Sequence, residues 1–138
     1  MPEDGPLPAP GSVDVVLLDA PCSGLGALRR RPEKRWRLTP EDGDRLAVIQ
    51  GGMLRQAASL VRVGGRVVYP TCSVSRTENQ DVVSTFLASA GETFVTAVLT
   101  DAVPSAWRDG IGENGWFQPV PRLGGPDGHF GAALTGVR

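Results

Sequence analysis

The stretch of sequence that decides the fold is VDVVLLDAPCSG, residues 13–24. Its first half is apolar apart from Asp14 and rich in β-branched side chains, which is typical of a strand buried on both faces of a parallel sheet. Its second half is rich in turn-forming residues and cannot continue a strand. We therefore predict a buried strand over residues 13–18, followed at its carboxyl end by a loop that carries Asp19 and Cys22.

A second strand and loop of the same kind follow further along the chain. Residues 66–69 (RVVY) form the strand candidate, and PTCS follows at residues 70–73. Between the two strands, TPED at residues 39–42 has a hydroxyl N-cap, an early proline and acids in the first turn, which predicts a helix start. Apolar residues then recur at steps of three and four, and the glycine pair 64–65 predicts the end of this helix.

The remaining elements are predicted from shorter patterns. Residues 77–80 (TENQ) resemble a capping box and predict the start of a second amphipathic helix that runs to Ala90. Residues 93–99 and 130–137 are predicted as strands, with a long Gly/Pro-rich connection over 101–128 between them. The order strand, helix, strand, helix, strand, loop, strand indicates an α/β fold with right-handed crossovers.

The predicted topology brings the two cysteines to one end of the sheet. The first two strands would be parallel and, as neighbours, about 4.8 Å apart. Ligands of open α/β sheets bind outside the carboxyl ends of the strands. Because Cys22 follows one strand and Cys72 follows the next, we expect both thiols at the functional end of the sheet.

Length and composition limit the classes of protein. The chain has 138 residues, enough for one domain, and 41% of them are hydrophobic, as in an ordinary globular protein. The net charge of −1 excludes a uniformly basic nucleic-acid coat protein but not a local basic patch. No apolar run approaches the ~20 residues of a membrane span, and the first ten residues lack the pattern of a signal peptide. We therefore expect a cytoplasmic protein with no membrane partner.

The two cysteines have several ordinary interpretations. A zinc site usually takes about four ligands, whereas the chain has two separated cysteines and one histidine, so we expect no metal. A structural disulfide needs an oxidising compartment. A free cysteine is most often a small buried apolar residue, and a reactive thiol is the remaining interpretation. The position of both cysteines at strand ends favours the reactive thiol.

Four motifs, taken in order, resemble one enzyme family. They are DAPCSGLG at residues 19–26, the basic RRRPEKRW at 29–36, GGRVVYPTCS at 64–73 and PDGHF at 126–130. Together they resemble the RsmB/NOP-type (Sun/Fmu) RNA (cytosine-5)-methyltransferases. The resemblance covers the whole chain, 1–138, as the C-terminal part of the family's catalytic domain. It implies an α/β fold that is the C-terminal half of a Rossmann-like class I methyltransferase sheet with flanking helices.

The resemblance also implies a chemistry and a cofactor. Methylation of cytosine at carbon 5 needs a thiolate that adds to carbon 6, because carbon 5 is otherwise a poor nucleophile. The family's pattern assigns this nucleophile to Cys72, and it assigns help with the later release of the product to Cys22. S-adenosyl-L-methionine is the implied cofactor, and Asp19 and Asp4 are the residues that would contact it. Hydrogen bonding to the cytosine edge is a second implied role for Asp19, and an ordinary turn is the alternative for each aspartate.

The basic segment, residues 29–37, predicts an RNA partner. It holds six of the 14 Lys and Arg residues and one acid, a net charge of +5 in a chain whose net charge is −1. We expect Arg30 and Lys34 to contact phosphates of a ribosomal or transfer RNA, and Trp36 to pack in the core or to stack on a base. A solvated loop is the ordinary alternative, because most charge runs are simply hydrated.

Two parts of the resembled enzymes have no counterpart in this sequence, namely the glycine-rich cofactor loop and the separate RNA-binding domain. Such a partial sheet would have an unpaired edge at its first strand. Two hypotheses therefore stay open. One is half of a methyltransferase catalytic domain that needs a missing N-terminal half for activity, and the other is a non-catalytic remnant or RNA-contacting module. A thiol redox protein, with the Cα atoms of Cys22 and Cys72 within about 7 Å, is a third.

Overall fold

The strand expected near the start of the chain is the edge strand of a four-stranded sheet. The structure is a computed structural model that describes residues 6–119 and 121–138. The strands are β1 (Val13–Leu17), β2 (Val61–Thr71), β3 (Phe94–Thr96) and β4 (Phe130–Gly136). Their order in the sheet is β1-β2-β4-β3, with β1 parallel to β2 and β4 antiparallel to both of its neighbours. The prediction that the first two strands are parallel neighbours is confirmed, so their carboxyl ends meet at one end of the sheet.

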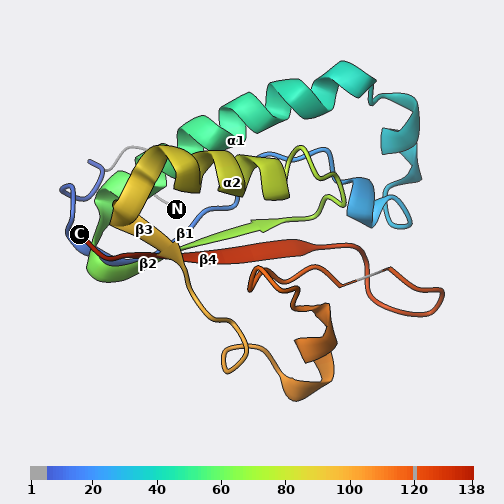
Figure 1. Ribbon diagram of the computed structural model, residues 1–138. Coiled ribbons are helices and arrows are strands. Elements are labelled where there is room, and N and C mark those ends of the chain that lie inside the picture. Colours follow the sequence, from blue (N-terminus) through green and yellow to red (C-terminus); the bar gives the residue numbers. More distant parts are fainter. Residues whose placement is uncertain (1–5, 120) are drawn as a thin grey trace.

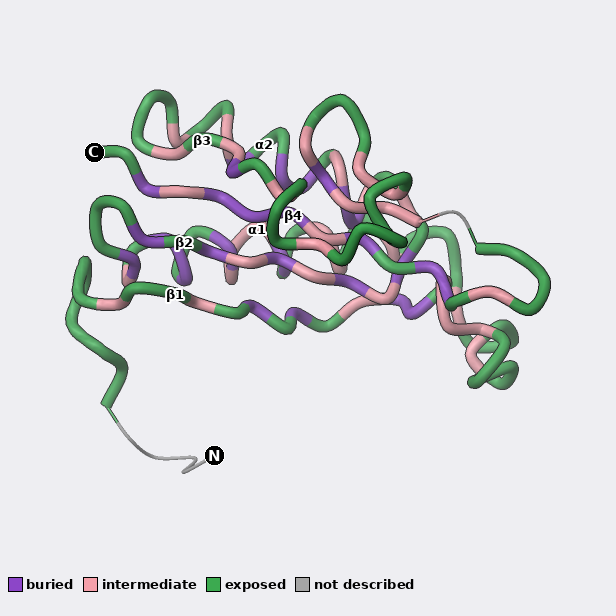
Figure 2. The backbone as a smooth tube through the Cα atoms, turned by 90° about the horizontal axis from the view of Figure 1, so that it is seen from below, coloured by how far each residue is buried: buried purple, intermediate pink, exposed green. Residues whose placement is uncertain are grey.

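Both helices, α1 (Pro40–Leu60) and α2 (Gln80–Ala90), cover the same face of the sheet (Figure 1). Their apolar side chains pack with β2 and β4 into one core, and Figure 2 shows the buried stretches along these two strands. The largest fully buried apolar side chains of this core are Leu54, Val67, Tyr69, Val83, Phe130 and Leu134. Most of the long connection from β3 to β4 lies on the side of the sheet away from the helices (Figure 1), although its Gln118 accepts a hydrogen bond from Gln80 at the start of α2. In the part of the chain described, neither helix is long and apolar enough to cross a membrane.

The first helix begins as predicted and ends earlier than predicted. Thr39 is its N-cap, Pro40 takes the first position, and the Thr39 N–H donates to the Asp42 carboxylate over 2.9 Å. This reciprocal cap satisfies backbone donors that the first helical turn leaves unpaired. The helix ends at Leu60, so the prediction that the glycine pair 64–65 ends it is wrong.

These two glycines instead lie in an irregular part of β2. The register of β2 against β1 shifts between Val13 and Val15. Gly64 has a positive φ of 78°, and a Cβ on Gly65 would lie 2.8 Å from the Asp14 carbonyl oxygen. Glycine is required here because one position takes a left-handed conformation and the other lets two strand backbones approach closely.

Two later predictions also differ from the structure. Asn79 is the N-cap of α2 and makes no side-chain capping hydrogen bond, so the capping box predicted over 77–80 is wrong. The third strand is shorter than the predicted 93–99, although the Ala97 N–H still donates to a carbonyl of β4. The first difference arises because Glu78 and Gln80 bond to distant parts of the chain rather than to their own helix.

The outer side of β1 is an open edge. Val15 and Leu17 are 58% and 68% exposed although they belong to a run whose pattern predicts burial. Within residues 6–119 and 121–138, β2 is the one strand that pairs with β1. The prediction of an unpaired edge at the first strand is therefore confirmed for the described part of the chain.

Candidate active site

The two cysteine side chains meet at the carboxyl ends of β1 and β2. Cys22 lies in the loop after β1, and Cys72 directly follows β2. Their Sγ atoms are 3.0 Å apart, and both residues are half-buried free thiols. Because β1 and β2 are parallel neighbours, the loops that follow them lie side by side. The prediction that both thiols lie at this end of the sheet is confirmed.

Backbone contacts fix the loop that carries Cys22 against Cys72 and against the segment before β4. The Gly26 N–H donates to the Cys72 carbonyl over 2.9 Å, and the Gly128 N–H donates to the Gly26 carbonyl over 2.9 Å. A Cβ on Gly26 would lie 1.9 Å from the Gly128 carbonyl oxygen. The glycines of the DAPCSGLG and PDGHF motifs thus permit an approach that a side chain would block.

The surroundings of Cys22 hold its proton. Burial raises the pKa of the Cys22 thiol to about 11, and its hydrogen bond with the Cys72 side chain acts in the same direction. Cys22 is therefore protonated at neutral pH and can donate the hydrogen bond between the two sulfurs, in which either atom could be the donor. Such a bond stabilises negative charge on the accepting atom. Of the two thiols, Cys72 is thus the better candidate for a nucleophile.

A fully buried carboxylate joins the two cysteine loops. Glu78 lies just before α2, and its Oε1 accepts hydrogen bonds from the hydroxyls of Ser23 and Ser73. Its Oε2 accepts from the Ser23 N–H over 2.8 Å and from the Gln50 side-chain amide over 3.0 Å. We call these four residues the Glu78 cluster. It connects the loop after β1, helix α1, the loop after β2 and the start of α2 through one side chain.

Sequence reasoning misses the Glu78 cluster, although one signal for it exists. Gln50 lies four residues before Leu54 on the buried stripe of α1, and a polar side chain at such a position needs a buried partner. A second buried pair lies next to the cluster, because the Thr71 hydroxyl donates to the Asn79 side-chain oxygen. Glu78 and Asn79 of TENQ therefore serve the loops of the site rather than the cap of α2.

The two cations predicted to contact RNA have different surroundings. Arg30 and its neighbour Arg29 pair with the buried Asp127 carboxylate, at 2.6 and 2.9 Å. Lys34 Nζ lies 3.5 Å from the Ser23 carbonyl oxygen, which places it at the edge of the thiol site. Arg30 therefore also ties the basic segment to the segment before β4, whereas Lys34 brings a positive charge to the loop that carries Cys22.

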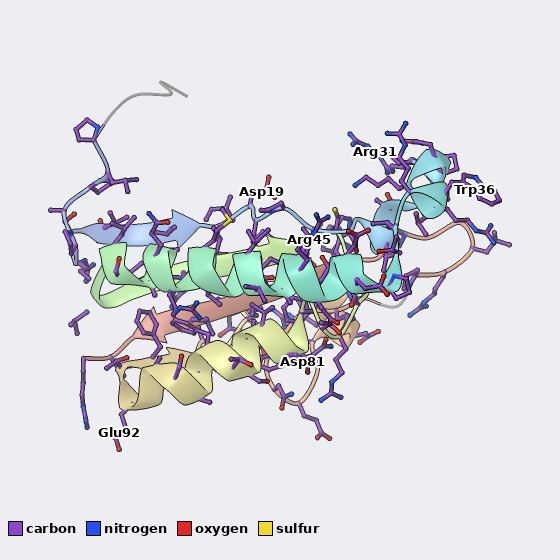
Figure 3. The ribbon with its side chains drawn as sticks, turned by 90° about the horizontal axis from the view of Figure 1, so that it is seen from above. Asp19, Arg31, Trp36, Arg45, Asp81 and Glu92 are labelled. Carbon is purple, nitrogen blue, oxygen red and sulfur yellow. The ribbon has the colours of Figure 1, made fainter. Side chains whose placement is uncertain are left out.

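The outer part of the basic segment projects from the molecule. Trp36 is 85% exposed, so the interpretation that it packs in the core is wrong. The guanidinium of Arg35 lies 5.9 Å from the centre of the Trp36 ring. Figure 3 shows Trp36 and Arg31 together at the same end of the molecule. An exposed aromatic ring among cations is the pattern that stacks on unpaired bases.

The residues predicted to hold the cofactor are only partly in place. Asp19 is exposed in the loop after β1, and Figure 3 shows it on the β1 side of the molecule, pointing away from α1. Asp4 lies outside the described residues. The glycine pairs 51–52 and 64–65 lie inside α1 and β2, so neither forms a turn from a strand into a helix. The described residues thus offer one exposed carboxylate in this loop, and neither glycine pair fits a glycine-rich cofactor loop.

Comparison with known proteins gives consistent matches. The model of a family described as 16S rRNA methyltransferase RsmB/F matches residues 6–135. The ribosomal RNA small subunit methyltransferase B of Thermus thermophilus is 44% identical over 130 residues, which are 94% of this chain and 31% of the relative. The ribosomal RNA small subunit methyltransferase F of Aeromonas salmonicida is 34% identical over 125 residues, 91% of this chain and 26% of the relative. The chain thus spans about a quarter to a third of these relatives.

Solved structures show the same fold. The structure titled PH0851 superposes with a TM-score of 0.80 at 33% identity and covers 91% of this chain and 27% of that chain. The structure of NSun6 from Pyrococcus horikoshii with SFG superposes with a TM-score of 0.70 at 28% identity, over 88% of this chain and 29% of that chain. The four-stranded sheet and its helices are therefore one part of a larger methyltransferase fold.

Proposed function

We propose, since this chain belongs to the 16S rRNA methyltransferase RsmB/F family, that it carries the catalytic thiols of an enzyme that methylates carbon 5 of a cytosine in RNA. The observation that supports this proposal most directly is the 3.0 Å separation of the Cys22 and Cys72 sulfurs. They lie where two parallel strands end, which is where open α/β sheets bind their ligands. Ribosomal RNA is the favoured substrate, because the relatives are named for the small ribosomal subunit.

The chemistry requires a nucleophile that is later released. The Cys72 thiolate adds to carbon 6 of the cytosine, and the electron pair of the C5–C6 double bond makes carbon 5 nucleophilic. Bound S-adenosylmethionine would supply the methyl group that carbon 5 accepts and would leave as S-adenosylhomocysteine. A base then removes the proton from carbon 5, the double bond forms again, and the bond between carbon 6 and the Cys72 sulfur breaks.

Cys22 assists this cycle by keeping its proton. Its pKa of about 11 leaves it a hydrogen-bond donor at neutral pH, 3.0 Å from the sulfur that must carry negative charge. Donation to that sulfur stabilises it as the leaving group when its bond to carbon 6 breaks. We therefore assign the nucleophile to Cys72 and assistance in product release to Cys22.

The basic segment supports an RNA substrate at this site. Lys34 lies against the loop that carries Cys22, and Trp36 with its cationic neighbours is open to solvent. Positive charge of this kind contacts phosphates, and an exposed ring stacks on an unpaired base. Arg30 adds to the positive surface while its ion pair with Asp127 fixes the segment in place.

The test uses a chimera in which residues 6–135 replace the matching segment of the Thermus thermophilus relative, which is 44% identical. We expect the chimera to form 5-methylcytosine in 16S rRNA, measured by nucleoside mass spectrometry. Cys72→Ala abolishes this product while RNA binding persists. Cys22→Ala accumulates a denaturant-resistant protein–RNA adduct, because addition proceeds and release does not. Turnover by the Cys72→Ala chimera contradicts the assignment of the nucleophile.

A non-catalytic RNA-contacting module is the second candidate function. It is favoured by one observation, namely that neither glycine pair of the described residues forms the loop that the cofactor requires. It predicts RNA binding by the chain without any methylation by the chimera, so the same experiment separates the two functions.

A further inference from the structure

The geometry points to Glu78 as a positioning residue that holds the two thiols together. The inference rests on the proposed function, because it assigns Glu78 to the same pair of cysteines. Each cysteine is followed directly by a serine, in Cys22-Ser23 and Cys72-Ser73, and both serine hydroxyls donate to the same oxygen, Glu78 Oε1. One carboxylate therefore holds both Cys-Ser dipeptides.

The burial of Glu78 shows that this contact is specific. Its side chain has no exposed area, and within the described residues no ion pair reaches it. A buried carboxylate is costly unless hydrogen bonds replace its lost water. Four donors do so here, from Ser23, Ser73 and Gln50, with the Ser23 backbone and hydroxyl both taking part. A residue that only started α2 would need none of these partners.

The backbone of Glu78 is fixed as well as its side chain. Its carbonyl accepts the Tyr69 hydroxyl over 2.7 Å, and Tyr69 is a fully buried residue of β2. Gln50 donates both to Glu78 and, over 2.9 Å, to the Pro21 carbonyl directly before Cys22. The carboxylate is thus a fixed point from which the two loops are held.

The consequence is a parallel arrangement of the two Cys-Ser dipeptides. The Ser23 and Ser73 hydroxyl oxygens are 3.1 Å apart, and the Cys22 and Cys72 sulfurs next to them are 3.0 Å apart. Holding the serines at this separation holds the sulfurs at theirs. Without the carboxylate, the two loops lose the side-chain link through Glu78, while the backbone hydrogen bond from Gly26 to Cys72 remains.

The two informative variants differ in what they keep. Glu78→Ala removes all four hydrogen bonds. Glu78→Gln keeps them, because its amide oxygen accepts from the Ser23 N–H and from Gln50, and its NH₂ donates to the two hydroxyls, which rotate to accept. Glu92→Ala is the matched control, since Glu92 is an exposed carboxylate that pairs with Arg138 at the far end of α2.

The experiment measures how tightly the full chain binds phenylarsine oxide, which bridges two thiols only when they are close together. We expect Glu78→Ala to weaken this binding by about tenfold or more, equivalent to about 1.4 kcal/mol. The dissociation constants of Glu78→Gln and Glu92→Ala for phenylarsine oxide should both stay within about threefold of that of the original chain. Rescue by glutamine is the readout that a general loss of stability would not produce. Unchanged binding by Glu78→Ala, or equal loss by Glu78→Gln, overturns the inference.

A third variant keeps the test decisive when Glu78→Ala does not fold by circular dichroism. Ser73 is the residue next to Cys72, and Ser73→Ala removes one of the four hydrogen bonds to Glu78. This variant should weaken binding of the arsenical by less than Glu78→Ala does. Unchanged binding by that variant also overturns the inference. The arsenical needs no RNA and no cofactor, so loss of methylation by the chimera with normal dithiol binding counts against the proposed function and not against Glu78.

Discussion

Cys22 and Cys72 occupy matching positions after neighbouring strands, yet their surroundings suit them to different work. An ordinary thiol with a pKa of about 8.5 is only a few per cent ionised at neutral pH, and ionisation is what makes it a nucleophile. Burial takes Cys22 further from that state by raising its pKa to about 11. The same burial makes it a dependable hydrogen-bond donor. The asymmetry of the pair therefore follows from where each loop places its sulfur, not from the identity of the residue.

The pH dependence of alkylation tests this asymmetry. In the variant Cys72→Ala, Cys22 is the single remaining thiol. That variant loses the hydrogen bond with Cys72, but burial, the larger cause of the raised pKa, remains. Because the thiolate is the reactive form, the rate at which iodoacetamide alkylates Cys22 should rise with pH. The midpoint of this rise should lie above 9.0 and below about 11. Mass spectrometry of the alkylated chain gives the profile, and a midpoint at or below 9.0 contradicts the burial argument.

At the scale of elements, glycine has opposite effects in the first helix and in the second strand. Gly52 lies inside α1 with open space where a Cβ would point, so it only adds flexibility to the helix. Gly65 lies in β2, where a Cβ would meet the Val61 side chain at 2.7 Å and the Asp14 carbonyl oxygen at 2.8 Å. The first glycine is dispensable, and the second is required by the approach of β1.

These two glycines give a matched pair of stability predictions. Gly52→Ala should raise the free energy of unfolding by about 0.5–1 kcal/mol, because alanine has the higher helix propensity. Gly65→Ala should lower it by about 1–3 kcal/mol, because the new methyl group pushes β1 and β2 apart. Urea unfolding of the full chain, followed by circular dichroism, measures both. Equal effects of the two substitutions would show that the irregular part of β2 is not tightly packed.

Local patterns predicted the elements whose causes are local. The cap of α1 at Thr39 depends on residues three positions apart, and the strand that leads to Cys22 depends on a continuous apolar run. The burial predicted for that strand is wrong, because Val13–Leu17 are exposed or half-buried at the open edge of the sheet. The thiol pair was predictable because parallel strands carry their loops to the same end. The role of Glu78 was not predictable, because the same local sequence suits a glutamate that caps a helix and one that is buried. Its partners Ser23 and Gln50 lie 55 and 28 residues away.

At the scale of the whole molecule, the open edge of β1 and the exposed Asp19 lie on the same side (Figure 3). The chain spans 26–31% of the relatives it matches, and in the described residues neither glycine pair forms a loop between a strand and a helix. The thiol pair, by contrast, is assembled within the described residues, from the loops after β1 and β2 and the Glu78 cluster that joins them. The chemistry of the thiols and the binding of the cofactor are therefore separable in this fold.

Calorimetry with S-adenosylmethionine tests this separation. We expect no detectable heat from the chain alone, because its described residues offer Asp19 and no glycine-rich loop, and we expect clear binding by the chimera with the Thermus thermophilus relative. In the chimera, Asp19→Ala should weaken binding by about tenfold, since an exposed carboxylate suits the cationic amino group of the cofactor. Glu92→Ala is the control carboxylate. Heat of binding from the chain alone would contradict the separation of thiol chemistry from cofactor binding. No heat from either the chain or the chimera would favour the RNA-contacting module over the enzyme.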